Sequence, residues 1–169
     1  VWNNLKELPV TRKFLISFFF YNTGVQTVMY MAAQFGSKVL HLEGGELIFT
    51  ILIINIIAVL GSYSFAKLSV FKGNKFSLAT MLLIWVAVCL AAFMITTKIQ
   101  FFALAFVVGM IMGGIQALSR ATYSKLIPKD TKDLASFFSF YDVTYNVSIV
   151  VGTFAYGAIE NITGSMRNS

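Results

Sequence analysis

The sequence predicts an all-α protein, a polytopic bundle of five transmembrane helices. Hydrophobic residues make up 57% of the 169 residues and charged residues only 12%, whereas a water-soluble domain carries about 25% charged residues. The mean hydropathy is +0.77. Apolar residues come in continuous blocks of about 20, the length that crosses a ~30 Å hydrocarbon layer as a helix. Blocks of this length favour helices over transmembrane strands, which have about ten residues of alternating polarity.

The first two predicted spans lie in the N-terminal part of the chain. The first covers residues 11–39 and begins after Pro9, because proline is tolerated in the first turn of a helix but not inside one. A polar loop with two adjacent glycines follows, and the second span covers residues 46–68. Its apolar centre is interrupted only by Asn55, so it is suited to cross the hydrocarbon layer.

The remaining three predicted spans cover residues 76–97, 99–127 and 134–160. Only a few residues around Lys98 separate the third span from the fourth, and so short a connection forces the two helices to run antiparallel. The fourth ends before Pro128, since a helix rarely continues through the residue that precedes a proline. A polar loop then leads into the fifth span.

Basic residues are distributed unevenly between the loops, which predicts the orientation. Ten of the thirteen lie at the chain start or beside the turns after the second and fourth spans: Lys6, Arg12, Lys13, Lys67, Lys72, Lys75, Arg120, Lys125, Lys129 and Lys132. The other side holds only Lys38, Lys98 and Arg167. Short loops rich in Lys and Arg stay in the cytoplasm, so the N-terminal end is predicted to be cytoplasmic. This topology explains the net charge of +6 without nucleic acid as a partner.

Residues for enzyme chemistry are missing from the sequence. The single histidine, His41, lies in a predicted outer loop, and the single cysteine, Cys89, lies within the third span. These residues provide neither a Ser-His-Asp set nor a cluster of metal ligands, and the sequence contains no glycine-rich phosphate loop. We therefore expect no enzyme activity, no metal and no cofactor.

Two charged residues lie deep inside predicted spans, away from the span ends. Asp142 is about nine residues from the start of the fifth span and Arg120 about seven residues from the end of the fourth, so they lie ~13 Å and ~10 Å deep. A charge facing lipid costs roughly 2.5 to 3.5 kcal/mol, so both are expected to face inward and to pair. Asp142 could exchange a proton or form part of a cytoplasmic gate. Alternatively, the pair only neutralises two buried charges and locks the helices.

Further polar residues extend these faces at helical spacing. Gln116 lies one turn from Arg120, and Asn146 lies one turn from Asp142. We predict a hydrated seam through the bundle, lined by the substrate-pathway candidates Asn22, Gln26, Tyr141, Tyr145 and Asn146. The candidates for coupling or for a gate are Asp142, Arg120 and Gln116. Hydrogen bonding between helices without any solute is the alternative, and Asn55, alone in its span, is interpreted as structural.

Several glycines predict close contact between helices. Gly109 and Gly113 have the GxxxG spacing that lets two helix backbones approach each other. Gly24, Gly152 and Gly157 are predicted to mark close contacts or soft points in the first and fifth spans.

The segment from Gly113 to Val143 reads GGIQALSRATYSKLIPKDTKDLASFFSFYDV. It resembles the major facilitator superfamily, and within it the branch of bacterial relatives of the vacuolar amino-acid effluxers linked to autophagy. In that branch a GG-Q-ALSR stretch at the end of the tenth helix, an IP turn and an F-x-F-YD stretch opening the eleventh occur together.

The turn at residues 66–75 resembles the loop G-x-x-x-D-R-x-G-x-K/R that joins helices eight and nine in the superfamily. Gly73 and Lys75 match this cytoplasmic loop motif. Val70 and Phe71 replace its acidic residue and its arginine, so the charge relay associated with the loop is not expected to form here.

The resemblance implies that the chain corresponds to helices seven to eleven, a C-terminal half that lacks its last helix. The chain begins with Val1 and ends just after a polar loop, and we expect a fragment whose N-terminal half and last helix are missing. The resemblance also implies a protein of a bacterial inner membrane, in contact with lipid, that is part of a secondary active or facilitative transporter. The expected substrate is a small solute, with amino acids and proton coupling as the finer expectation. A membrane scaffold or assembly subunit that transports nothing is the alternative.

Overall fold

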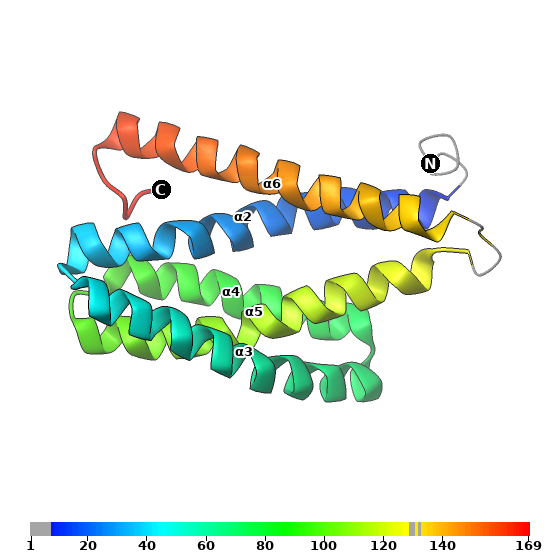
Figure 1. The fold of residues 1–169 in the computed structure, drawn as a ribbon, viewed down its shortest axis with the longest axis horizontal. Helices are drawn as coiled ribbons and strands as arrows, with labels where there is room; N and C mark the ends of the chain where they lie inside the picture. Colours follow the sequence, from blue (N-terminus) through cyan, green and yellow to red (C-terminus); the bar gives the residue numbers. More distant parts are fainter. Residues whose placement is uncertain (1–7, 129–130, 132) are drawn as a thin grey trace.

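The structure is a computed structural model that describes residues 8–128, 131 and 133–169. It contains the five helices α2 (Pro9–Leu40), α3 (Gly44–Lys72), α4 (Asn74–Met94), α5 (Lys98–Leu126) and α6 (Leu134–Thr163) (Figure 1). The prediction of an all-α helix bundle is confirmed. Lys6, Lys129 and Lys132, which the orientation argument uses, lie outside the described residues.

The boundary between α4 and α5 differs from the predicted one. The helix α4 ends at Met94 rather than near Thr97, because Thr97 serves as the N-cap of α5. Its hydroxyl oxygen accepts a hydrogen bond from the backbone N–H of Gln100, and the side-chain oxygen of Gln100 accepts one from the backbone N–H of Thr97. This capping box satisfies backbone groups that the start of a helix otherwise leaves unpaired.

Four of the described helices, α3, α4, α5 and α6, are long and apolar enough to cross a membrane. The helix α2 is not among them, although it is long enough for a span at 32 residues. It buries the polar side chains of Thr11, Asn22, Gln26 and Thr27, so part of its surface is adapted to other helices rather than to lipid. The count of five spans therefore stays a prediction.

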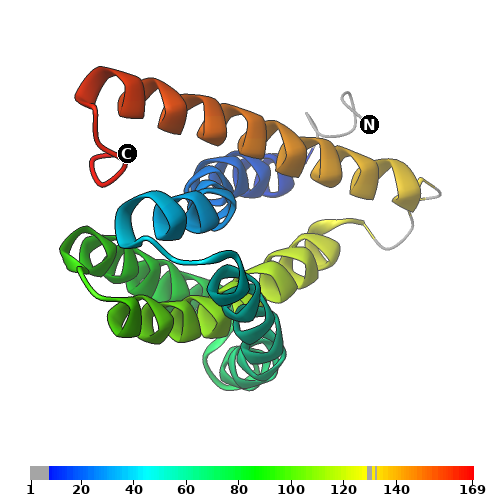
Figure 2. The same cartoon turned by 60° about the vertical axis from the view of Figure 1, so that its left-hand side comes forward.

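The helices form two groups (Figures 1 and 2). In the first, α5 packs along α3 and against α4. A Cβ atom built at Gly113 would lie 2.0 Å from the carbonyl oxygen of Ala58, and one built at Gly61 would lie 1.9 Å from that of Met110. Gly109 also faces α3, since its Cβ would lie 2.8 Å from the carbonyl oxygen of Ile54. The close contact predicted from the GxxxG spacing is therefore present.

In the second group, α6 packs along α2. A Cβ atom at Gly152 would lie 2.0 Å from the hydroxyl oxygen of Thr27, so this glycine also permits close approach. No atom lies within 4 Å of the corresponding position at Gly24 or Gly157. These two glycines mark no close contact within the described chain.

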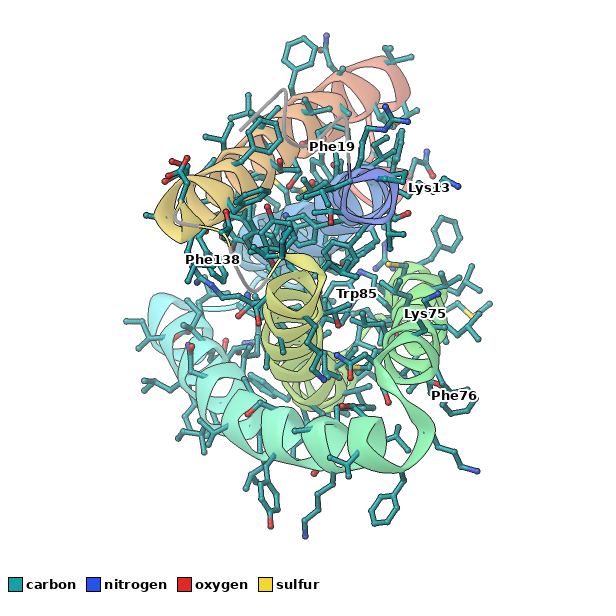
Figure 3. The ribbon with its side chains drawn as sticks, turned by 90° about the vertical axis from the view of Figure 1, so that its right-hand side faces the viewer. Lys13, Phe19, Lys75, Phe76, Trp85 and Phe138 are labelled. Atoms are coloured by element: carbon teal, nitrogen blue, oxygen red, sulfur yellow. The ribbon has the colours of Figure 1, made fainter. Side chains whose placement is uncertain are left out.

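Each group has its own ion pair at the end where α2 runs into α3. Glu46 of α3 pairs with Lys98 of α5 at 2.7 Å, and Lys38 of α2 pairs with Glu160 of α6 at 3.4 Å. The other end is called the basic end here, because its described residues include Arg12, Lys13, Lys67, Lys72, Lys75 and Lys125. Figure 3 views the bundle from the basic end, with Lys13 and Lys75 at its periphery and Trp85 directed inward from α4.

The core lies where α2, α4 and α5 meet. Met81 and Trp85 of α4 pack there against Val25 of α2 and Ile111 of α5. Many other large apolar side chains point outward, and Phe154, for example, is 78% exposed. Such an outer surface is suited to lipid, where apolar side chains need no cover from other protein.

Candidate functional site

A cavity of about 300 Å³ lies between α2, α5 and α6 in the half of the bundle nearer the basic end. Polar and charged side chains form part of its wall, within an otherwise apolar bundle. The lining residues are Phe18, Asn22, Ile115, Gln116, Ser119, Arg120, Tyr141, Asp142 and Tyr145. Six of the eight residues proposed from the sequence for the solute pathway, coupling or a gate therefore line one cavity. A cavity of this size, apolar with a few converging polar groups, is typical of small-molecule sites.

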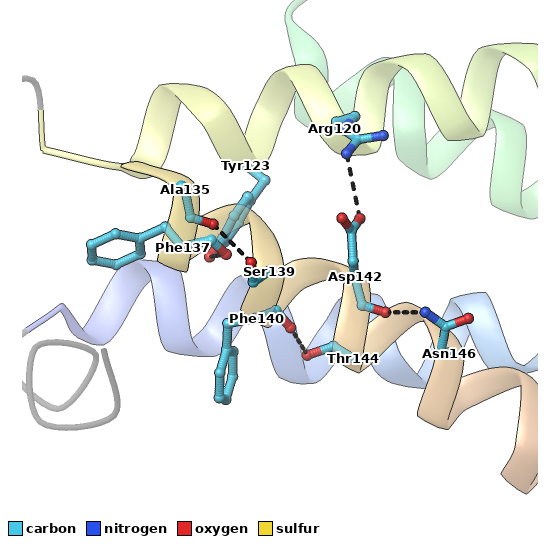
Figure 4. A network of polar contacts seen from close by, with 9 residues as sticks. All are labelled: Arg120, Tyr123, Ala135, Phe137, Ser139, Phe140, Asp142, Thr144 and Asn146. Carbon is cyan, nitrogen blue, oxygen red and sulfur yellow. Dashed lines mark hydrogen bonds and ion pairs between the residues drawn. The ribbon is translucent and has the colours of Figure 1, made fainter. Parts of the chain in front are cut away.

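Arg120 of α5 and Asp142 of α6 form an ion pair across the cavity (Figure 4). The guanidinium Nη2 lies 3.4 Å from Oδ1 of Asp142, and the two side chains are 58% and 53% exposed. The interpretation of the pair as two buried charges is therefore wrong for the described chain. The two charges lie on facing helices at similar depth, as expected, but both open toward the surface beside the cavity. An ion pair this exposed contributes little to stability.

Aromatic rings hold the Arg120 side chain in place. The guanidinium carbon lies 5.7 Å from the centre of the Phe138 ring and 5.9 Å from that of Tyr141. Contacts of this kind attract a cation to the ring face. The ring of Tyr141 in turn stacks on Phe18 of α2, with ring centres 4.4 Å apart. Arg120 thus lies beside two aromatic rings as well as Asp142, and its guanidinium has five N–H donors that can serve further partners.

Asn22 lies at the inner wall of the cavity. Its side-chain amide donates to the hydroxyl of Ser148 on α6, and its carbonyl oxygen accepts a hydrogen bond of 3.3 Å from Nε2 of Gln26. The Ser148 hydroxyl donates to the carbonyl oxygen of Tyr145. Asn22 and Gln26 are each 2% exposed. Gln26 therefore lies behind Asn22 and supports it without lining the cavity.

Asn146 and Asn55 do not line the cavity either. The exposed amide of Asn146 donates to the carbonyl oxygen of Asp142 in its own helix (Figure 4). Asn55 on α3 similarly donates to the carbonyl oxygen of Ile51. The structure thus brings together Asn22, Gln116, Arg120, Tyr141, Asp142 and Tyr145, and it leaves Asn146 on the outer surface of α6.

Two serines and a tyrosine at or beside the cavity were not predicted from the sequence. Ser119 lines the cavity and is fully buried, and its hydroxyl lies 2.7 Å from that of Tyr21 on α2. Ser148 anchors Asn22 in the same way. Serines within helices usually bond to their own backbone, so their presence alone carried no signal. The two serines become recognisable only in the structure, where each one bonds to a residue of α2.

Tyr123 attaches the basic end of α5 to α6. Its hydroxyl donates a hydrogen bond of 2.9 Å to the carbonyl oxygen of Phe137, and its buried ring lies 5.1 Å from that of Tyr141. Tyr123 therefore ties the last turns of α5 to the first turns of α6.

The loop motif residues Gly73 and Lys75 lie away from the cavity. Gly73 has a φ of +86° and separates α3 from α4, a backbone conformation that favours glycine. Lys75 is exposed in the first turn of α4. Gly73 therefore has a conformational role at the turn, and Lys75 does not line the cavity.

Comparison with known proteins assigns the chain to a family. The family described as vacuole effluxer Atg22 like matches residues 1–169. The chain belongs to the Atg22-like family. The resemblance found in the sequence is therefore confirmed. The family is described as an effluxer family and one relative is named as a transporter, and neither name is that of an enzyme.

Two relatives illustrate the reach of the match. The Atg22-like chain is 30% identical over 174 residues to the uncharacterised MFS-type transporter YxiO of Bacillus subtilis, covering 97% of this chain and 40% of YxiO. It is 26% identical over 176 residues to autophagy-related protein 22 of Saccharomyces cerevisiae, covering 98% of this chain and 32% of that protein. The chain thus spans less than half the length of these relatives. No solved structure matches it.

The family and the apolar helices together identify a multi-pass integral membrane protein. The numbering of the helices of the Atg22-like chain as seven to eleven of a larger protein remains a prediction.

Proposed function

We propose that this chain is part of a transporter that moves a small solute across a membrane by alternating access, with the cavity between α2, α5 and α6 on the solute's path. One observation carries the proposal: three helices direct polar and charged side chains into one cavity of about 300 Å³. Polar and ionisable residues within membrane helices are costly and typically mark solute or ion pathways.

Amino acids are the solute class that this cavity suits. Arg120 offers a cation with unused donors, and Asp142 offers a carboxylate 3.4 Å away. A zwitterion carries a carboxylate and an ammonium group that match this arrangement, and an Arg guanidinium binds a carboxylate by two parallel hydrogen bonds. The family description, a vacuole effluxer, is compatible with such a cargo. The solute would then replace the internal ion pair with two pairs of its own.

Asp142 is the proposed site of proton coupling. It is half exposed in the cavity wall, so protons can reach it, and neutralising it removes its attraction for Arg120. A cycle in which Asp142 alternates between Arg120 and a proton would link the ion pair to solute release. The basic end would face the cytoplasm by the positive-inside rule, and the membrane would be a bacterial inner membrane.

The remaining part of the transporter completes the site in this proposal. The curated relatives are more than twice as long as the matched region. In carriers built from two repeats, substrate binds near the bilayer midplane between the repeats. The outward-facing side of Gln116 and Arg120 would therefore meet the N-terminal half of the same protein, and a last helix would complete the C-terminal half.

A membrane scaffold without a transport cycle is the second candidate. Two of the residues expected to face the pathway, Gln26 and Asn146, do not line the cavity, and Gln26 serves a buried hydrogen-bond chain between α2 and α6. A scaffold needs such chains and needs no solute.

Transport by the full-length protein distinguishes the two. The protein is reconstituted in vesicles and tested for uptake of labelled amino acids, with Asn22→Ala as the site variant. Asn55→Ala is the matched control, because its amide bonds only to its own helix. Uptake that Asn22→Ala reduces and Asn55→Ala preserves supports the transporter. A correctly folded protein that moves no solute in a panel of amino acids, peptides, sugars and drugs supports the scaffold.

A further inference from the structure

Asn74 makes an unusual set of contacts at the turn between α3 and α4. Its carbonyl Oδ1 accepts hydrogen bonds from the hydroxyl of Ser69 at 3.1 Å and from the ammonium group of Lys125 at 3.4 Å. Its amide Nδ2 donates a hydrogen bond of 2.8 Å to the hydroxyl of Thr122. One half-buried side chain therefore connects the end of α3, the start of α4 and the last turns of α5.

These contacts are the polar connection between the α3–α4 turn and α5 at the basic end, within the residues that the structure describes. The two loop residues that replace the charged pair of the superfamily motif cannot supply one. Val70 and Phe71 are apolar, and they are 83% and 82% exposed. Asn74, the residue after Gly73, thus makes the polar contact with α5 that Val70 and Phe71 cannot make.

The face of α5 that Asn74 holds is opposite the face that carries Arg120. Thr122 follows Arg120 by two residues, which corresponds to about 200° of rotation and ~3 Å of rise along the helix. Tyr123, the next residue, is bonded to the carbonyl oxygen of Phe137 on α6. The basic end of α5 is therefore held on one side by Asn74 and on the other by α6, with Arg120 one turn away.

We propose that Asn74 is a positioning residue for the Arg120–Asp142 pair. By fixing the rotation of α5 against the α3–α4 turn, its amide sets where the Arg120 guanidinium lies in the cavity. The expected effect on transport rests on the proposed function. The structural part, the placement of α5 relative to α6, can be tested without any transport measurement.

Substitutions of graded severity test the contacts of the amide. Asn74→Asp keeps acceptors for Ser69 and Lys125 and also for the Thr122 hydroxyl, which can donate to a carboxylate, so it serves as the conservative variant. Asn74→Leu has a similar size and removes all three hydrogen bonds. Thr122→Val removes only the partner hydroxyl, with almost no change of shape. Asn55→Leu is the matched control, an asparagine whose amide bonds only to its own helix.

The structural readout is the distance between spin labels in the full-length protein. Labels at Ser124 of α5 and Ser139 of α6, both exposed, are introduced into a cysteine-free background. Their distance distribution is compared between the unsubstituted protein and each variant. We expect a narrow distribution that Asn74→Leu and Thr122→Val shift or broaden alike. The double variant should add nothing to either single one, because both remove the same bond. Asn55→Leu should match the unsubstituted protein.

The transport readout compares two quantities in each variant, the maximal transport rate and the KM for the solute. Asn74 does not line the cavity, so Asn74→Leu, which removes three hydrogen bonds, should lower the maximal rate about threefold to tenfold, the effect of even one ordinary hydrogen bond, with little change of KM. Asn74→Asp, which keeps acceptors for all three partners, should recover most of the rate.

Unchanged distances and unchanged transport in both Asn74→Leu and Thr122→Val would overturn the proposal, as would an equal change in Asn55→Leu. If Asn74→Leu fails to fold, Thr122→Val decides the question by the same distances. Altered distances in a protein that transports no tested solute would support the positioning of α5 and count against the proposed function alone.

Discussion

Arg120 and Asp142 form the ion pair that joins the two groups of helices. The other two ion pairs of the described chain stay within a group: Glu46 with Lys98 inside α3–α5, and Lys38 with Glu160 inside α2–α6. Only the pair of Arg120 on α5 and Asp142 on α6 bridges the groups, and it does so at the wall of the polar cavity. Breaking it removes a connection between the groups without disturbing the packing inside either one.

Neutralising Asp142 should impair transport and leave the fold intact. We expect Asp142→Asn in the full-length protein to reduce proton-linked transport, because the amide can neither release a proton nor attract Arg120 as a charge. Uptake into vesicles under an imposed pH gradient measures the effect. Glu160→Gln, which breaks the ion pair within α2–α6, is the control. Unchanged transport would remove Asp142 from the mechanism, whereas loss of expression would favour a structural role.

Arg120 should determine the affinity for a carboxylate-bearing solute. We expect Arg120→Gln to weaken binding about tenfold or more, since hydrogen bonds between charged groups are worth ~1.5–3 kcal/mol. Arg120→Lys should recover part of this loss, because an ammonium group retains the charge but not the planar fork. The measurement is the solute-dependent rise in melting temperature. Arg167→Gln, an arginine outside the cavity, should bind normally. Equal affinity in Arg120→Gln and Arg167→Gln would exclude Arg120 from the binding site.

Two glycines should respond oppositely to the same substitution. A methyl group at Gly113 would collide with the backbone of α3, so Gly113→Ala should destabilise the protein by about 1–3 kcal/mol, the usual cost of overpacking. Gly157 has no atom within 4 Å of the Cβ position, and alanine there should stabilise the helix by about 0.5–1 kcal/mol. Thermal unfolding in detergent measures both. A destabilised Gly157→Ala would indicate a contact with a part of the protein beyond this chain.

The chain of hydrogen bonds through Asn22 should stabilise the contact of α2 with α6. Asn22→Leu leaves the buried amide of Gln26 without Asn22 as its partner, while Ser148 keeps its bond to Tyr145, and an unsatisfied buried group costs about 1–3 kcal/mol. We expect a clear fall in melting temperature, with Asn55→Leu near that of the unsubstituted protein. Equal melting temperatures of the two variants would contradict the observed hydrogen bonds.

The fold was largely predictable because the apolar blocks match the length of a membrane span. The boundary at Thr97 was not, since a run of apolar residues shows no break where a capping box begins the next helix. Depth along the helix predicted that Arg120 and Asp142 meet, because helix rise is constant. Their exposure depends on the rotation of α5 and α6, which depth does not fix.

The sequence also could not tell Asn74 from Asn55. Both are asparagines near or within apolar helices, and a short polar side chain can bond to its own helix or to another. Asn55 does the former and Asn74 the latter. The same ambiguity concealed Ser148, whose partner Asn22 lies 126 residues away. Only the packing of α2 on α6 brings Ser148 within bonding distance of Asn22.

Protection of a cavity residue by the solute tests the proposed pathway most directly. Gln116 lines the cavity and is exposed, so Gln116→Cys in a cysteine-free full-length protein should react with a maleimide reagent. We predict that a transported solute at saturating concentration slows this reaction severalfold, while Ser64→Cys on the outer surface of α3 reacts at the same rate with and without solute. A transported solute that leaves the labelling rate of Gln116→Cys unchanged would contradict the assignment of this cavity to the solute's path.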